Sequence, residues 1–183
     1  SHSEKDWHAW VFDKISFAPT SKIVEFGCGS GSLWVKNDNK IQKGWSVLLS
    51  DMSDGMLKKS KQHLSHLPNI SFQLLDVQQA DLDSSSFDVA IANHMLYHVP
   101  DINKALTSIR RTLKPGGKFY AATNGTNHMR EIYELIEEYD PSLSLTKPIN
   151  VKLFGLENGG EILGNNFQDV KLIRYDSHLR VTN

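Results

Sequence analysis

The chain alternates short apolar runs with longer stretches in which apolar residues recur at helical spacing. This pattern is typical of strands joined by helices, because parallel strands need crossover connections of about a dozen residues or more. Five strands are predicted, and they span residues 22–26, 45–50, 70–75, 87–92 and 118–123. The alternation therefore predicts an α/β fold in which a doubly wound, mostly parallel sheet is covered by helices on both faces.

The end of the chain departs from this rhythm. Residues 167–175 and 178–181 are predicted as two further strands, and the short connection between them favours an antiparallel hairpin. A length of 183 residues fits one domain. Within it we expect residues 1–18 to form an N-terminal helix and candidate lid, and residues 140–166 to form a candidate insertion on the substrate side. The chain opens without an initiator Met, so we also expect that it is trimmed or carries the remnant of a tag.

Composition narrows the classes of function. The 20 basic and 21 acidic residues give a net charge of -1, which is not the field of a non-specific nucleic-acid binder. No apolar run reaches the ~18 residues of a membrane span and no secretory signal opens the chain, so we expect a cytoplasmic protein without a membrane partner. A single cysteine, Cys28, excludes an internal disulfide, and no histidine pair has a third ligand at a familiar spacing, so no metal is predicted.

Acids, glycines and one amide occur where the predicted strands end. Glu25 lies in the first strand, which runs into a Gly-Cys-Gly-Ser-Gly turn at residues 27–31. Asp51, Asp76 and Asn93 end the next three strands. Open α/β sheets bind ligands outside the carboxyl ends of their strands, so this edge is the predicted binding site.

Each of these features has a plainer alternative. Glycines permit a close approach of a ligand, but a glycine-rich turn between a strand and a helix is common by itself. A dinucleotide fingerprint has its third glycine at the sixth position, where this chain has Ser32. Asp51 suits the two hydroxyls of a ribose, and its position beside the glycine-rich turn favours this role over a charge at the start of a helix. Asp76 suits an exocyclic adenine amine or a solvated loop.

Together these segments resemble the class I S-adenosylmethionine-dependent methyltransferases, and within them the small-molecule branch that includes the quinone-biosynthesis enzymes. The resemblance is carried, in family order and spacing, by residues 24–31, 49–57, 75–77, 87–93 and 113–117. It implies S-adenosylmethionine as the cofactor, a small-molecule methyl acceptor, and a seven-stranded Rossmann-like sheet whose last strand is antiparallel.

The resemblance also implies roles at the methionine end of the cofactor. Glu25, Gly27 and Gly29 would line this end, and Cys28 and Gly31 would complete the turn. A thiol near helix amides can be reactive, so Cys28 is either a reactive group or, as we prefer, a small packed spacer.

At the adenosine end the resemblance implies four further contacts. Asp51 would hold the ribose hydroxyls and Met52 would pack on the adenine. Asp76 would meet the adenine amine, and Val77 would offer its backbone. Away from the adenosine end, Asn93 and His94 after the fourth strand would lie next to the methyl-bearing sulfur.

The segment after the fourth strand supplies the candidate catalytic residues His94, Tyr97 and His98. Methyl transfer mainly requires alignment of nucleophile, carbon and sulfur, and a base is needed only where the nucleophile must lose a proton. Histidine titrates near neutral pH, so His94 is the preferred base, whereas Tyr97 and His98 are equally compatible with packing roles. Trp7 and Trp10 are either a lid over the site or core residues of a docked helix.

The leading interpretation is a methyltransferase acting on a small organic molecule. A nucleotide-dependent oxidoreductase on a related fold is a rival, and Ser32 argues against it. A non-catalytic protein that retains the cofactor pocket is a second rival. A nucleic-acid methyltransferase is disfavoured, because the fourth strand ends in Asn-His-Met-Leu rather than the Asn-Pro-Pro-aromatic type.

Overall fold

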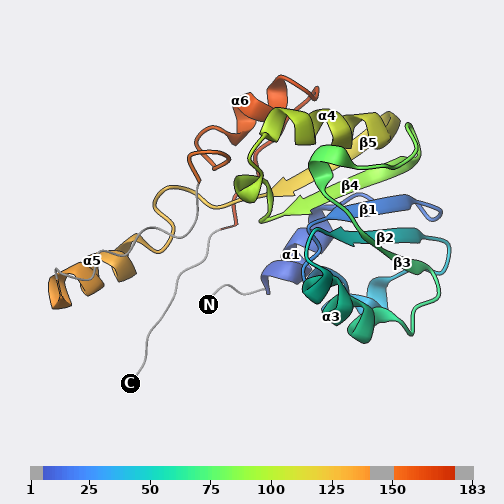
Figure 1. Cartoon of the computed structure of the whole chain (residues 1–183), viewed down its shortest axis with the longest axis horizontal. Helices are drawn as coiled ribbons and strands as arrows, with labels where there is room; N and C mark the ends of the chain where they lie inside the picture. Colours follow the sequence, from blue (N-terminus) through green and yellow to red (C-terminus); the bar gives the residue numbers. More distant parts are fainter. Residues whose placement is uncertain (1–5, 141–150, 176–183) are drawn as a thin grey trace.

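A computed structural model describes residues 6–140 and 151–175 (Figure 1). Five strands form one sheet in the order β3-β2-β1-β4-β5, and every neighbouring pair is parallel. The chain order reverses between β1 and β4, so their carboxyl ends flank the crevice in which such sheets bind ligands. The strands are β1 (Lys22–Phe26), β2 (Ser46–Asp51), β3 (Ile70–Leu74), β4 (Phe87–Asn93) and β5 (Leu113–Ala122).

Helices cover both faces of this sheet. α1 and α3 lie on one side, and α4 and α6 lie on the other (Figure 1). The helices are α1 (Trp7–Lys14), α2 (Ser32–Val35), α3 (Asp54–Leu64), α4 (Ile102–Thr112), α5 (Arg130–Tyr139) and α6 (Gly159–Gly164), with 3₁₀ turns η1 (Asp38–Lys40), η2 (Val77–Gln79) and η3 (Leu96–His98). None of the helices in the described ranges is long and apolar enough to cross a membrane.

The core consists of two apolar layers because alternate residues of a strand point to opposite faces of the sheet. In β1, Ile23 joins the layer beneath α1 and α3, whereas Val24 joins the layer beneath α4. Val89 and Ala90 of β4 divide in the same way. Burial of each large aliphatic side chain stabilises the fold by about 1.5–3 kcal/mol. The central strands therefore form a rigid base for the residues at their ends.

Local sequence signals fix where two helices begin near the binding edge. The Ser53 hydroxyl accepts a hydrogen bond from the Met56 amide at 3.4 Å and caps α3. Asp101 caps α4 by accepting from the Lys104 amide at 3.0 Å. Because α3 starts directly after Asp51, its cap also fixes the backbone that follows this acid.

The α/β fold class with a parallel sheet is confirmed, but the predicted number of strands is wrong. The described residues contain five strands rather than seven, and they show no antiparallel hairpin. Residues 167–175 form no strand, and Val170, Leu172 and Ile173 are 39%, 58% and 56% exposed. The other predicted strand, 178–181, lies outside the described residues. An apolar run becomes a strand only where a partner offers backbone hydrogen bonds, which composition does not reveal.

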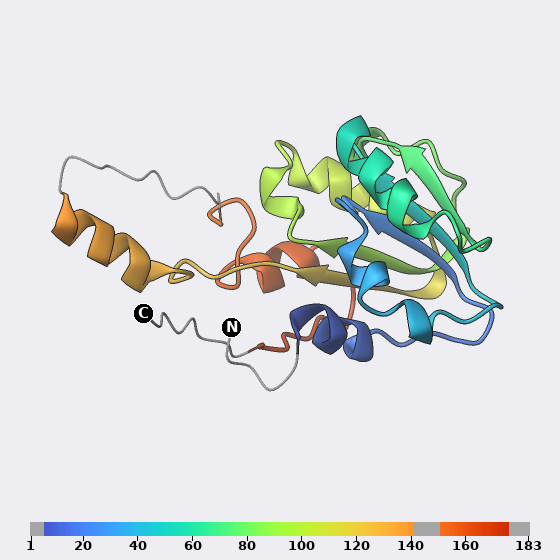
Figure 2. The same cartoon turned by 90° about the horizontal axis from the view of Figure 1, so that it is seen from below.

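Helix α5 is present, but its apolar side is not buried as predicted. The sequence pattern places Met129, Ile132, Tyr133, Leu135 and Ile136 inward, yet no residue of α5 is buried. Leu135 is 63% exposed. Figure 2 shows α5 standing away from the sheet and its covering helices. The helical pattern is thus correct, whereas the partner it implies is not present in the described part of the chain.

Strand β5 begins earlier than predicted, at Leu113, which pairs with Phe87. The register shifts between Phe87 and Val89 of β4, and the Pro-Gly-Gly sequence at residues 115–117 of β5 forms a bulge opposite this point. Regular pairing resumes at Lys118. Such a bulge inserts residues without ending the strand. The predicted turn is therefore contained within the strand.

Candidate functional site

The turn after β1 needs glycine at three positions. Gly27, Gly29 and Gly31 have φ angles of 65°, 56° and 78°, a left-handed conformation that side chains rarely adopt. A Cβ atom at Gly27 would lie 2.7 Å from the Cβ of Met95, and one at Gly31 would lie 2.7 Å from the Ser60 hydroxyl. These two glycines are therefore required by packing within the protein.

Gly29 differs from its two neighbours in what surrounds it. A Cβ atom at this position would meet no atom within 4 Å, so the backbone here borders open space. The Gly29 amide donates to Asp51 Oδ2 at 2.8 Å, which ties the turn to the end of β2. The structure thus leaves room for a ligand to approach the backbone at this glycine.

The glycines give a matched set of alanine substitutions. Gly31→Ala should destabilise the protein by about 2–4 kcal/mol, because a left-handed backbone penalty adds to overpacking against Ser60. Gly29→Ala should lower the free energy of unfolding by only about 1–2 kcal/mol, because the backbone penalty acts alone there. Gly116→Ala is the control, since it has φ 76° and open space but lies outside the glycine turn, in the bulge of β5, so its loss should match that of Gly29→Ala. Urea unfolding measures all three, and equal losses at Gly29 and Gly31 would contradict the packing argument.

Asp51 connects the ends of β1 and β2. Its Oδ2 accepts from the Gly29 amide and its Oδ1 accepts from the Ser53 amide, each at 2.8 Å. The side chain is half-buried. A carboxylate has about four acceptor sites, so two remain for other donors. The fixed carboxylate at the switch point is therefore suited to two adjacent hydroxyl groups.

Glu25 lies deeper, on β1, with only 2% of its surface exposed. Its Oε2 accepts from the Trp34 indole Nε1 at 2.6 Å, and its Oε1 accepts from the Asn93 amide Nδ2 at 3.2 Å. Burial raises the pKa of Glu25 to about 7, against the two hydrogen bonds, and the charge of Asp51 adds to the increase. Glu25 and Asn93, both predicted site residues, are thus in direct contact.

Asp76, Val77 and Met52 occupy the outer part of the same edge. Asp76 follows β3 and accepts from the Gln78 amide at 2.9 Å, so it caps η2. Val77 is buried beneath it, with 5% exposed. Met52 is 77% exposed, which leaves its side chain available to a flat ligand group. The adjacent ends of β2 and β3 therefore carry the predicted adenosine-side residues.

His94 follows Asn93 in a left-handed conformation, with φ 51°, and its amide donates to the Ala122 carbonyl at 2.9 Å. Its ring lies against the indole of Trp7, with 4.7 Å between the ring centroids. Burial, with the charges of His128 and His8, lowers the pKa of His94 to about 4. A non-glycine residue is uncommon in this conformation, although histidine adopts it more often than most. His94 is therefore a neutral imidazole at physiological pH.

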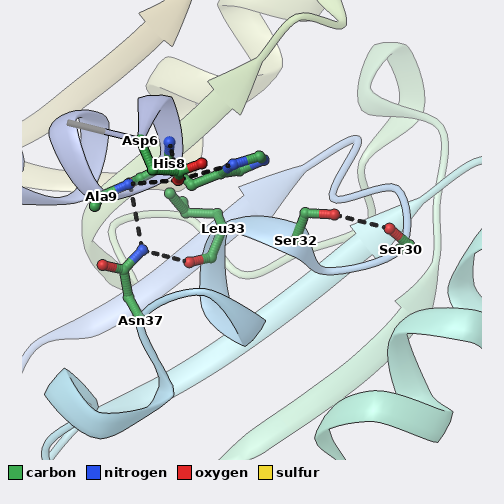
Figure 3. A network of polar contacts seen from close by, with 7 residues as sticks. All are labelled: Asp6, His8, Ala9, Ser30, Ser32, Leu33 and Asn37. Carbon is green, nitrogen blue, oxygen red and sulfur yellow. Dashed lines mark hydrogen bonds and ion pairs between the residues drawn. The ribbon is translucent and has the colours of Figure 1, made fainter. Parts of the chain in front are cut away.

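The contact between Trp7 and His94 depends on how α1 is anchored. Figure 3 shows Asn37, beyond the end of α2, reaching the first turn of α1. Its Nδ2 donates to the His8 carbonyl at 3.3 Å and to the Leu33 carbonyl at 2.8 Å. Asp6 caps the same turn by accepting from the His8 amide at 3.0 Å (Figure 3). This network fixes the start of α1 beside the end of β4.

The other predicted residues are placed differently from His94. Tyr97 is buried, with 6% exposed, and burial raises the pKa of its hydroxyl. His98 is exposed, and its ring lies 4.5 Å from that of Tyr97. Cys28 is buried, and burial together with the charges of Glu25 and Asp51 raises the pKa of its thiol. A thiol of raised pKa is a poor nucleophile, which favours the packed spacer over the reactive group.

A large hollow begins beside Asn93 and His94 and runs along β5. Trp7 and Tyr97 line it near the histidine, and Tyr120 lines it further along the strand. The glycine turn and Asp51 do not line this hollow. The structure thus has two adjoining regions, a polar edge at β1 and β2 and an aromatic hollow at β4 and β5.

The sequence analysis did not identify Trp34 as a partner of the site residues. The structure shows its indole N–H hydrogen-bonded to Glu25. The interpretation of Trp7 as a docked helix residue or a lid did not identify His94 as its partner. Neither contact has a local sequence signal, because each joins elements whose spatial relation depends on the sheet.

The parallel order 3-2-1-4-5, a glycine turn after β1 and an acid after β2 define a Rossmann-like α/β protein with a ligand-binding edge at its switch point. The chain belongs to the methyltransferase domain family, whose sequence profile matches residues 24–121. The predicted resemblance is thereby confirmed. The family indicates S-adenosylmethionine as the cofactor, and it does not favour the oxidoreductase or the non-catalytic rival.

Individual relatives agree with this assignment. The chain is 28% identical over 115 residues to the ubiquinone biosynthesis O-methyltransferase of Coxiella burnetii, covering 62% of this chain and 48% of that protein. It is 29% identical over 115 residues to the ubiquinone/menaquinone biosynthesis C-methyltransferase of Idiomarina loihiensis, covering 61% and 46%. A SAM dependent methyltransferase structure from Aquifex aeolicus matches with a TM-score of 0.67 and 14% identity, over 87% of this chain and 78% of that one. The chain spans about half the length of the curated relatives it matches.

Proposed function

We propose that this protein transfers a methyl group from S-adenosylmethionine to a small organic acceptor. The observation that carries the proposal is the open space at Gly29 beside the fixed carboxylate of Asp51. The turn allows a ligand to lie against the backbone, and the carboxylate has free acceptor sites for a ribose diol. Both features stand at the switch point of a sheet that belongs to a methyltransferase family.

In this proposal the outer edge holds the adenosine half of the cofactor. Asp51 accepts hydrogen bonds from the ribose hydroxyls, and Asp76 accepts one from the adenine amine. The exposed side chain of Met52 covers one face of the adenine, and Val77 contributes its backbone. The positions of these residues at the ends of β2 and β3 support the assignment.

The methionine half lies against Glu25, Gly27 and Gly29, with Asn93 next to the sulfur. Cys28 and Gly31 shape the turn and do not react. The bound cofactor supplies an electrophilic methyl group on a cationic sulfur. The protein then has to exclude water and align the acceptor, and alignment alone can contribute about 7–11 kcal/mol to the rate.

The aromatic hollow beside His94 receives the acceptor. His94 accepts a proton from the acceptor or orients it, and Trp7 holds the imidazole in place. Tyr97 lines the same hollow, whereas the exposed His98 is the weaker candidate. The names of the two relatives from quinone biosynthesis favour an aromatic acceptor, and the aromatic lining supports this.

The wider organisation is part of the same proposal. Residues 1–183 act as one cofactor-binding domain, in which residues 1–18 close the acceptor side and residues 140–166 cover the substrate. We place the protein in the cytoplasm, without a nucleic-acid or membrane partner, and the net charge of -1 is compatible with this.

The test is a comparison of ligands by titration calorimetry. S-adenosylhomocysteine, the demethylated product, should bind with micromolar affinity, about -8 kcal/mol, and NAD should not bind detectably. An acceptor screen of phenols and other small aromatic compounds follows with S-adenosylmethionine present. Tighter binding of NAD than of S-adenosylhomocysteine would overturn the assignment.

A further inference from the structure

Glu25 is a buried carboxylate without a cationic partner in residues 6–140 and 151–175. Both of its oxygens accept hydrogen bonds from neutral groups, Trp34 Nε1 at 2.6 Å and Asn93 Nδ2 at 3.2 Å. A buried charge is unfavourable unless it is paired or hydrogen-bonded. The two donors therefore stabilise the charge and orient it, but they do not neutralise it.

Trp34 is the more tightly constrained of the two donors. It is completely buried on α2, with 0% of its surface exposed. Its ring packs edge-on against Phe12, with 5.9 Å between the centroids, and against Phe17 at 6.4 Å. The indole therefore has no room to turn away, and its N–H stays directed at Glu25 Oε2. Hydrogen bonds to a charged acceptor are roughly twice as strong as neutral ones.

We propose that Trp34 is a positioning residue whose indole N–H holds Glu25 as an oriented carboxylate for the α-ammonium group of the cofactor. The inference rests on the proposed function. An indole is uncharged, so it orients the carboxylate without competing for it as an arginine or lysine would. The counter-charge is then supplied by the ligand, which makes this end of the site selective for a cationic group.

This arrangement has a consequence for the pH dependence of binding. Burial raises the pKa of Glu25 to about 7, so a fraction of Glu25 is protonated at neutral pH. The titratable groups that interact with it are Asp51, whose charge raises the pKa of Glu25 further, and Cys28, whose own raised pKa keeps it a neutral thiol. An ammonium ligand favours the ionised form. Its affinity is therefore highest above about pH 7 and falls as the pH decreases through this value.

The decisive variant is Trp34→Phe, which removes the donor and keeps most of the aromatic volume. Without the indole hydrogen bond the pKa of Glu25 rises further, because that bond stabilises the ionised form. The affinity for S-adenosylhomocysteine should fall about tenfold near neutral pH. The pH at which half of the affinity is lost should move upward, and the difference from the wild type should shrink above about pH 8.

Trp45→Phe is the matched control. Trp45 is also buried, with 4% exposed, in the same apolar layer, and its Nε1 donates to the Ala18 carbonyl at 2.9 Å. This variant loses an indole hydrogen bond and comparable packing but leaves Glu25 unchanged. Its affinity and pH profile should match the wild type. A purely structural role for Trp34 would lower affinity by the same factor at every pH.

The choice of ligand separates this inference from the proposed function. 5′-Methylthioadenosine keeps the adenosine part of the cofactor but has no ammonium group. Its affinity should be the same in Trp34→Phe and in the wild type. If the wild type binds neither ligand, the proposed function fails. If both ligands bind and Trp34→Phe weakens both equally, the proposed function stands and the inference is overturned.

A second measurement uses the unaltered protein in case Trp34→Phe does not fold. In ¹⁵N–¹H spectra one of the four tryptophan indole resonances should move with a midpoint near the pKa of about 7 of Glu25. The same resonance should be insensitive to pH in Glu25→Gln. Four indole resonances that do not move between about pH 5 and pH 9 would overturn the inference.

Discussion

Replacing His94 with alanine is expected to reduce turnover about 100-fold while the affinity for S-adenosylhomocysteine stays nearly unchanged. The imidazole lies at the end of β4, beyond Asn93, on the side of the aromatic hollow. The proposed cofactor contacts are made by Glu25, Asp51 and Asp76 on other strands. The loss should therefore appear in kcat and not in cofactor binding.

The expected loss of turnover, about 100-fold, is small for the removal of a general base, because the surroundings of His94 make it a weak base. Burial and two neighbouring histidines lower the pKa of His94 to about 4. The imidazole is thus neutral and able to accept a proton at pH 7, but it is a weak base. With saturating cofactor, kcat should remain flat on the acid side between about pH 6 and 8, where a histidine of ordinary pKa would titrate.

Kinetics with an identified acceptor measure this prediction, and His66→Ala is the control. His66 is exposed beyond the end of α3, away from the hollow, so its removal should not alter kcat. A loss confined to the KM of the acceptor would assign His94 to orientation in place of proton transfer. Unchanged kcat and KM in a folded His94→Ala variant would exclude a role in the reaction.

The strands and their polar ends were predictable because they depend on local patterns. β1 was predicted with its exact bounds, and the polar residues Asp51 and Asn93 were predicted at the ends of β2 and β4. Parallel strands share one carboxyl edge, so Asp51 and Asn93 were expected to lie at the same edge without any knowledge of the strand order. Local periodicity and topology therefore define the cofactor side of the site.

What was missed depends on contacts between distant segments. Residues 167–175 have the composition of a strand but find no strand partner within the described chain. Trp34 is nine residues from Glu25 in sequence, and only the packing of α2 against β1 turns its indole toward the carboxylate. Trp7 meets His94 because Asn37 anchors α1. Each of these contacts is determined by tertiary packing, which residue type and spacing do not encode.

Replacing Asp51 with alanine is expected to weaken S-adenosylhomocysteine binding by about 1.5–3 kcal/mol, which corresponds to roughly 10–150-fold in Kd. Asp51 contributes in two ways. It offers its free acceptor sites to the ribose, and it holds the Gly29 amide at 2.8 Å, so its loss also loosens the turn. Asp51→Asn keeps the size of the side chain and one of its oxygens, so it should weaken S-adenosylhomocysteine binding less than Asp51→Ala does. Asp54→Ala is the matched control, because Asp54 is an exposed acid in the next helix whose partner is Lys58.

Calorimetry and thermal unfolding together decide between the two contributions of Asp51. The residue is half-buried at a strand end, outside both core layers, so Asp51→Ala should fold normally. If the loss comes from the ribose contact, binding of 5′-methylthioadenosine should weaken by the same factor, since this ligand retains the ribose. If the loss comes from the loosened turn, S-adenosylhomocysteine should be affected more, because the methionine part lies against Gly29. Unchanged affinity for both ligands in a folded variant would place the ribose contact elsewhere on the sheet edge.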